Sequence, residues 1–107
     1  MYATIRRYTP KSGAFEPKAI NDLKRRIEER FAPTLQEIRG FHSYYVVSAG
    51  PKELLSIGVF EDKAGATEST RKAAEFVKND PMKDLLATPE VREGEVLVQK
   101  EATVGAR

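Results

Sequence analysis

Residues 41–48 constrain the fold of this chain more than any other segment, because they read as a β-strand without a polar face. Aromatic, histidine, serine and valine residues fill both alternating sets of positions, and the segment holds the only histidine and two of the four tyrosines. An antiparallel sheet usually leaves one face to water, and its strands then alternate between apolar and polar residues. We therefore expect a partner subunit to cover the second face of the sheet and to enclose a pocket.

The size and charge of the chain fit one globular domain. It has 107 residues, of which 40% are hydrophobic and 32% are charged, and chains of about 100–150 residues rarely divide into two domains. The formal net charge is only +2, and the densest basic run, Lys24-Arg25-Arg26, is followed at once by Glu28 and Glu29. Nucleic-acid-binding proteins gather their basic residues on one face, so we expect no nucleic-acid partner.

Other classes are disfavoured by what the sequence does not contain. There is no cysteine, which excludes disulfides, a thiolate nucleophile and cysteine-based metal sites. No apolar stretch approaches the roughly 20 residues of a membrane span, and the first residues have no signal-peptide pattern. We expect a cytoplasmic protein with no membrane partner.

The order of predicted elements is β-α-β-β-α-β. Residues 1–8 alternate as in a strand, and a helix follows from about residue 16, where apolar residues recur at three- and four-residue steps up to Gly40. Pro33 should kink or break this helix. We expect strands at 41–48, 54–60 and about 95–101, a second helix capped by Asp62, and a short helical segment at 82–86. The predicted fold is α+β: a ferredoxin-like sandwich with a four-stranded antiparallel sheet and both helices on one face. It forms one domain over residues 1–102, with a tail at 103–107.

The hairpin of the two middle strands predicts which residues share a face. If its turn centres near Pro51, Val47 pairs with Leu55 and Tyr45 with Ile57. The purely apolar set should then lie under the helices; it consists of Leu55, Ile57 and Val59 with Ala3 and Ile5. The opposite face should be free and should meet a second copy; it carries Tyr2, Thr4, Arg6, Tyr8, His42, Tyr44, Val46, Ser56, Gly58 and Phe60. A free face with so many large apolar residues predicts a homodimer.

Two short motifs and the element order resemble a known group. The Gly40-Phe41 pair opens the second strand, and Val59-Phe60-Glu61-Asp62 joins the third strand to the second helix. With the β-α-β-β-α-β order, these resemble the dimeric α/β-barrel superfamily, and within it the antibiotic-biosynthesis-monooxygenase-like (ABM-like) family. The resemblance implies two ferredoxin-like subunits joined through their sheets, and a small-molecule pocket between the sheet and the helices of each subunit. It also implies relatives that are cofactor-independent monooxygenases acting on phenolic or quinone-type substrates, or haem-degrading enzymes.

The haem-degrading branch of that group is not favoured. It uses an asparagine on the first strand together with a tryptophan and a histidine on the second helix. This chain has no tryptophan, its histidine lies in the second strand, and Arg6 stands near the place of the asparagine.

Six residues are candidates for a site. His42 has a side chain whose ordinary pKa, about 6.5, suits a general base, and Arg6 on an inner strand must pair with a carboxylate or bind an anionic ligand. A structural interface role is the alternative for both residues. Tyr8, Tyr44, Ser56 and Phe60 are the candidate substrate-binding residues, and packing in the interface is again the alternative. A single histidine without cysteine or metal-binding spacing predicts no metal site, and we expect no cofactor.

Two classes of function follow. The first is a homodimeric small-molecule-binding protein that acts as a cofactor-independent monooxygenase on an aromatic or polyketide-like substrate. In it Arg6 stabilises the developing anion, and His42 accepts the proton. The second is a non-catalytic dimeric module with a stress-related or ligand-sensing role. An isomerase or lyase that uses a base and an anion clamp without oxygen is a third alternative.

Overall fold

The computed structural model describes residues 1–103. The expected tail, residues 103–107, lies outside the described residues except for Thr103. The elements are β1 (Tyr2–Tyr8), α1 (Pro17–Arg26), the π-helical turn η1 (Ile27–Phe31), α2 (Ala32–Gln36), β2 (Phe41–Ser48), β3 (Leu54–Phe60), α3 (Lys63–Lys78), the 3-10 turn η2 (Pro81–Asp84) and β4 (Glu90–Glu95).

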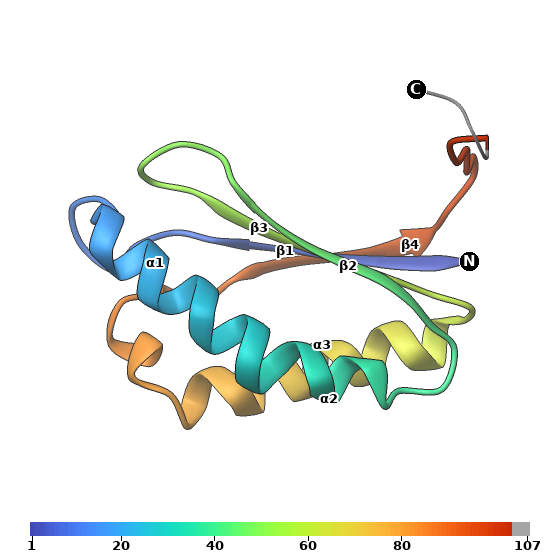
Figure 1. The fold of residues 1–107 in the computed structure, drawn as a ribbon, viewed down its shortest axis with the longest axis horizontal. Coiled ribbons are helices and arrows are strands. Elements are labelled where there is room, and N and C mark those ends of the chain that lie inside the picture. The colour runs from blue at the N-terminus through green and yellow to red at the C-terminus, as the bar shows by residue number, and fades with distance from the viewer. Residues whose placement is uncertain (104–107) are drawn as a thin grey trace.

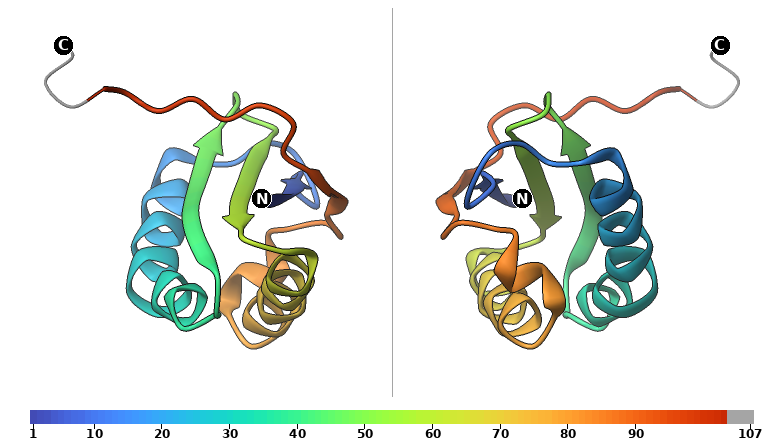
Figure 2. Two further views of the ribbon diagram at one scale, coloured as in Figure 1. Left: turned by 90° about the vertical axis from the view of Figure 1, so that its right-hand side faces the viewer. Right: turned by 90° about the vertical axis from the view of Figure 1, so that its left-hand side faces the viewer.

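The four strands form one antiparallel sheet in the order β2-β3-β1-β4. The helices all lie on one side of it, and the other side carries no helix (Figure 1, Figure 2). This is the ferredoxin-like sandwich that the sequence predicts, and its fold class is confirmed. No helix in residues 1–103 is both long and apolar enough to cross a membrane.

The first helical region changes its winding where the sequence predicts a break. Pro33 has no N–H to donate to the carbonyl of Glu29, and the chain adopts the π-helical turn η1 directly before α2. The backbone N–H of Ala32 donates to the carbonyl of Ile27, and the Thr34 hydroxyl donates to the carbonyl of Phe31 at 2.7 Å. The predicted disruption at Pro33 is therefore confirmed, with a π turn as its form.

The hairpin of β2 and β3 has the predicted register. Val47 pairs with Leu55 and Tyr45 with Ile57. One irregularity occurs at the start of β2, where Phe41 pairs with Phe60 and Ser43 with Val59. β2 thus advances by two residues where β3 advances by one, and His42 is the additional residue of a β-bulge.

The prediction of which sheet face lies under the helices is wrong. Thr4, Arg6, Ser56 and Phe60 are buried against the helices. The apolar set instead faces away from them; it consists of Ala3, Ile5, Tyr45, Val47, Leu55, Ile57 and Val59. Alternation along a strand fixes which residues share a face but not which face is covered, and the polar residues under the helices are held by hydrogen bonds that the sequence does not display. We call the apolar set the outer face of the sheet.

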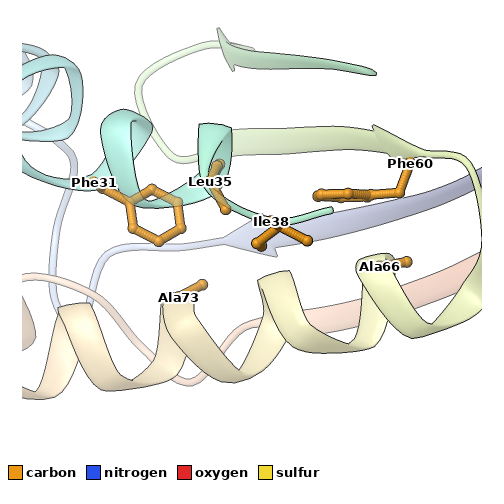
Figure 3. Packing of buried hydrophobic residues seen from close by; sticks show 6 residues of the cluster. All are labelled: Phe31, Leu35, Ile38, Phe60, Ala66 and Ala73. Atoms are coloured by element: carbon orange, nitrogen blue, oxygen red, sulfur yellow. The ribbon is translucent and has the colours of Figure 1, made fainter. Parts of the chain in front are cut away.

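Two clusters of buried side chains fill the space between sheet and helices. One joins α2, α3 and the end of β3 and contains Phe31, Leu35, Ile38, Phe60, Ala66 and Ala73 (Figure 3). The other lies toward α1 and η2 and contains Phe15, Leu23, Leu54, Met82 and Leu86. Asp62 caps α3 as predicted, because its side chain accepts the Gly65 N–H at 3.0 Å.

The last strand lies earlier in the sequence than predicted. The structure places β4 at Glu90–Glu95, paired with β1, instead of at 95–101. Glu90–Glu95 is rich in charge because β4 is an edge strand, and charged residues protect such edges from further pairing. The apolar residues that suggested a strand, Leu97 and Val98, are 87% and 80% exposed.

Candidate functional site

Arg6 is the centre of the candidate site. It lies in the middle of β1 on the helix-covered face and is only 1% exposed. Its Nη2 donates to the Ser56 Oγ at 2.9 Å, and its Nη1 lies 3.5 Å from the Thr70 Oγ1 of α3. Its Nε is buried and has no hydrogen-bond partner among the described residues. The guanidinium is therefore held firmly on one side and left unsatisfied on another.

No carboxylate in residues 1–103 forms an ion pair with Arg6. The nearest link to an acid runs through Thr70, whose hydroxyl donates to Glu93 Oε2 at 3.2 Å, and Glu93 is exposed. Arginine is almost never fully buried unless it is paired, and an uncompensated buried charge is strongly destabilising. The position of Arg6 is thus one that an anion would complete.

Two tyrosines border the same guanidinium. The Ser56 hydroxyl, which accepts from Arg6, donates to the hydroxyl oxygen of Tyr44 at 3.1 Å. Burial raises the pKa of Tyr44, although the Ser56 hydrogen bond and the charge of Arg6 oppose the increase. Burial also raises the pKa of Tyr8, again against the charge of Arg6. Both hydroxyls therefore stay protonated at neutral pH and can donate hydrogen bonds, but they do not serve as bases.

Three spaces that share some of their lining residues surround these side chains. A central cavity of about 30 Å³, enough for a water molecule, is bordered by Arg6, Tyr8, Tyr44 and Ser56 and otherwise by apolar side chains. A groove of about 370 Å³ opens beside α1 and shares Tyr44 with the central cavity; we call it the α1-side groove. A groove of about 470 Å³ opens beside α3 and shares Arg6 and Tyr8 with it; we call it the α3-side groove. The volumes of both grooves fall in the range of small-molecule sites.

The structure brings together four of the six predicted site residues: Arg6, Tyr8, Tyr44 and Ser56. Phe60 is fully buried elsewhere, in the cluster with Phe31, and lines none of these three spaces.

His42 also lies apart from the four. Its side chain is partly exposed at the bulge, 3.9 Å from the Glu101 carboxylate, and it lines none of the three spaces. Its role as a base stays a prediction.

Sequence analysis missed Thr70 as a polar member of the site. Thr70 occupies a position on the otherwise apolar face of α3, one turn after Ala66, and contacts both Arg6 and the hydroxyl of Thr4. A threonine on an apolar helix face that packs on a strand with a buried arginine was the available signal. In the part of the chain that the structure describes, no three acidic or histidine side chains gather as a metal site would require.

Comparison with solved structures shows the fold. A protein of unknown function from Nitrosomonas europaea superposes with a TM-score of 0.70 at 22% identity, over 95% of this chain and 94% of that chain. A dimeric ferredoxin-like protein from an uncultured marine organism gives 0.67 at 13% identity, over 94% and 98%. SnoaB, a cofactor-independent oxygenase from Streptomyces nogalater, gives 0.63 at 13% identity, over 92% and 94%.

These likenesses confirm the predicted ferredoxin-like fold. No protein-family model matches the chain, and no curated protein matches it. At such identities the likeness concerns the fold, and the chemistry has to be argued from the site itself.

Proposed function

We propose that this protein binds a hydrophobic phenol or enol as its anion, in the space between the sheet and the helices. The observation that carries the proposal is the burial of Arg6 without a carboxylate partner in the part of the chain that the structure describes. The surrounding surface is apolar apart from Tyr8, Tyr44 and Ser56, which suits an aromatic body with one oxyanion. The hydroxyl groups of the tyrosines supply further hydrogen-bond donors to that oxygen.

The buried charge gives this site a chemical effect on its ligand. An opposite charge close by favours the ionised form of an acid and lowers its pKa by about 1–3 units. A phenol or enol that enters the site therefore loses its proton more readily. The resulting anion is rich in electrons, and it is this species that reacts with dioxygen in cofactor-independent oxygenation.

We propose such an oxygenation as the reaction. A methylene group next to the ring is converted to a carbonyl, R₂CH₂ + O₂ giving R₂C=O + H₂O, so that the substrate supplies all the electrons. The oxygenase activity of the structural neighbour SnoaB supports this choice. Arg6 holds the anion, and Tyr8, Tyr44 and Ser56 orient it. The solvent at the groove mouths accepts the proton.

The binding step is tested with 2-naphthol, whose absorbance distinguishes phenol from phenolate. We expect the apparent pKa of the bound naphthol to fall by about 1–3 units and the fall to disappear in Arg6→Met. Arg71→Met removes a guanidinium that is exposed and paired with Glu68 and Glu75, and it serves as the matched control. Binding of naphthol with an unchanged pKa would refute the role of Arg6.

The catalytic step is tested by oxygen uptake with dihydroxy-aromatic compounds that carry an oxidisable methylene. We expect uptake that depends on Arg6. Uptake that is unchanged in His42→Ala would remove His42 as the base. Tight binding of the phenolate without any uptake would instead support the ligand-sensing alternative.

We further propose that the outer face of the sheet binds a second copy of the chain. Tyr45 is 60% exposed on this face, beside Val47 and Ile5, which are also exposed. Arg7 and Arg92 share this face at its β1 and β4 side, but an exposed apolar patch over β2, β3 and Ile5 is uncommon on a monomer. A structural neighbour is described as dimeric. We expect Tyr45→Glu to shift the protein from dimer to monomer in light scattering, whereas Lys63→Glu on the helical side leaves the mass unchanged. A wild-type protein that is monomeric at micromolar concentration would contradict the proposal.

A further inference from the structure

The two grooves that share lining residues with the central cavity differ in charge. The α1-side groove is lined by one base, Lys24, and one acid, Glu28, so its charges balance. The α3-side groove is lined by three lysines, Lys11, Lys78 and Lys83, in addition to Arg6, and no carboxylate of residues 1–103 lines it. The nearby Glu93 accepts from the lining residue Thr70 at 3.2 Å. Within the described residues none of the three lysines takes part in an ion pair. The positive potential of the site is therefore directed toward one side of the molecule.

The fold brings these lysines together from three segments. Lys11 follows β1, and its backbone N–H donates to the carbonyl of Leu85 at 2.9 Å. Lys78 is the last residue of α3, and Lys83 lies in η2. A second backbone bond, from the Ala87 N–H to the carbonyl of Thr9 at 2.9 Å, fastens the segment after η2 to the end of β1. The lysines thus stand on connected backbone around one opening.

Between the lysines and Arg6 the groove is mostly apolar. Ala74, Val77, Leu86 and Val91 line it, and its volume of about 470 Å³ accommodates a ligand larger than a single ring. The order from interior to rim is therefore a buried cation, an apolar stretch and a cluster of exposed cations. A ligand that matches this order has an acidic group at each end of an apolar body.

We infer that the natural ligand is an elongated aromatic or polyketide-like dianion whose second acidic group, a carboxylate or a phosphate, binds Lys11, Lys78 and Lys83 at the mouth of the α3-side groove. This inference rests on the proposed anion site at Arg6 and adds the substrate class and the direction of entry. The phenol or enol end reaches Arg6, and the second acid stays at the rim. The balanced α1-side groove has no comparable preference for an anion.

The test compares ligands that differ only in the second acid. The probes are 6-hydroxy-2-naphthoate, its homologues with the carboxylate on a short methylene spacer, and the methyl ester of each. We expect at least one acid to bind more tightly than its ester at low ionic strength, and this advantage to shrink as salt is added. Replacing Lys78 or Lys83 with glutamine should weaken binding of the acid about two- to fivefold for each lysine, with little change for the ester.

Three further variants separate the outcomes. Lys52 lies in the turn between β2 and β3 and lines none of the three spaces. The variant Lys52→Gln therefore controls for the loss of one positive charge. Arg6→Met should weaken acids and esters alike. Acids and esters that bind equally, or a selective loss in Lys24→Gln instead of the rim variants, would overturn the inference while the proposed function stands. Failure of every probe to bind would refute the anion site itself.

Discussion

The unpaired burial of Arg6 makes a prediction about stability that can be tested without any ligand. Arg6→Met replaces a buried cation by an apolar side chain of similar length. The substitution removes the hydrogen bond to Ser56, which has a charged donor and contributes about 1.5–3 kcal/mol, and the weak 3.5 Å contact with Thr70. It also removes the desolvation penalty of the guanidinium, which is several kcal/mol for a buried ion. We expect the free energy of unfolding to rise by about 1–3 kcal/mol.

Arg26 provides the matched control, because it is a largely buried guanidinium that does have a partner. Its Nε donates to Asp80 Oδ1 at 3.0 Å, and the Asp80 side chain is only 3% exposed. Asp80 also accepts the Met82 N–H at 3.0 Å. Arg26→Met leaves this carboxylate without its counter-charge, so we expect a loss of about 2–3 kcal/mol, below the usual range for a broken buried pair because Arg26 keeps contact with solvent. Replacing arginine by methionine is therefore expected to raise the free energy of unfolding at Arg6 and to lower it at Arg26.

The assay is urea unfolding at pH 7, followed by circular dichroism, with a thermal melt as the second measurement. For a domain of this size the expected gain in Arg6→Met corresponds to an increase of about 5–15 °C in Tm. All variants are compared at one protein concentration, since association would make the transition depend on concentration. A loss of stability in Arg6→Met as large as that in Arg26→Met would show that Arg6 is compensated in the ligand-free protein, and would refute the reasoning for an anion site.

Two other predictions concern the interior. Because burial raises the pKa values of Tyr8 and Tyr44, the stability that their neutral forms contribute is fully present below the ordinary tyrosine pKa of about 10 and is lost as the pH rises through the folded-state values. The urea concentration at the unfolding midpoint should therefore decrease as the pH is raised above about 10. The decrease should be smaller in the double variant Tyr8→Phe/Tyr44→Phe, and an equal decrease would contradict this assignment. Gly65→Ala should destabilise the protein by about 1–3 kcal/mol, since the new Cβ would lie 3.1 Å from the Cβ and Cδ2 of Phe60. Gly94→Ala, which meets open space, is its control in the same unfolding assay, and equal effects would refute the steric explanation.

Most elements and the register of the β2–β3 hairpin were predictable from the sequence because they depend on local patterns. Alternation, helical spacing, Pro33 and Asp62 are all local signals, and the structure confirms what they predict. The exception is β4, whose charged edge-strand sequence shows no apolar alternation. The covered face of the sheet was not predictable in this way. An apolar set of residues suits a helix layer and a partner subunit equally well, so hydrophobicity alone does not decide between them.

Alternation along the strands also predicted part of the candidate site. Arg6, Tyr8 and Ser56 share one phase of alternation with Tyr44, and the structure keeps them together. His42 was grouped with them by strict alternation, but the bulge between Phe41 and Ser43 interrupts the alternation. It turns Phe41 toward the Phe60 ring, whose centroid lies 5.9 Å from that of Phe41, and leaves His42 partly exposed. A bulge depends on the pairing of two strands, and the sequence of one strand does not display it.

The proposals for self-association and for ligand binding place their residues on opposite faces of one sheet. On β1, Ile5 points to the outer face and Arg6 to the interior, so adjacent residues serve different properties of the molecule. Under the two proposals above, changes at one set of alternate positions alter self-association, and changes at the other set alter ligand chemistry. Each set can therefore vary with little effect on the other. In a scan of every substitution along β1 and β3, these two properties should oscillate with a period of two residues and in opposite phase.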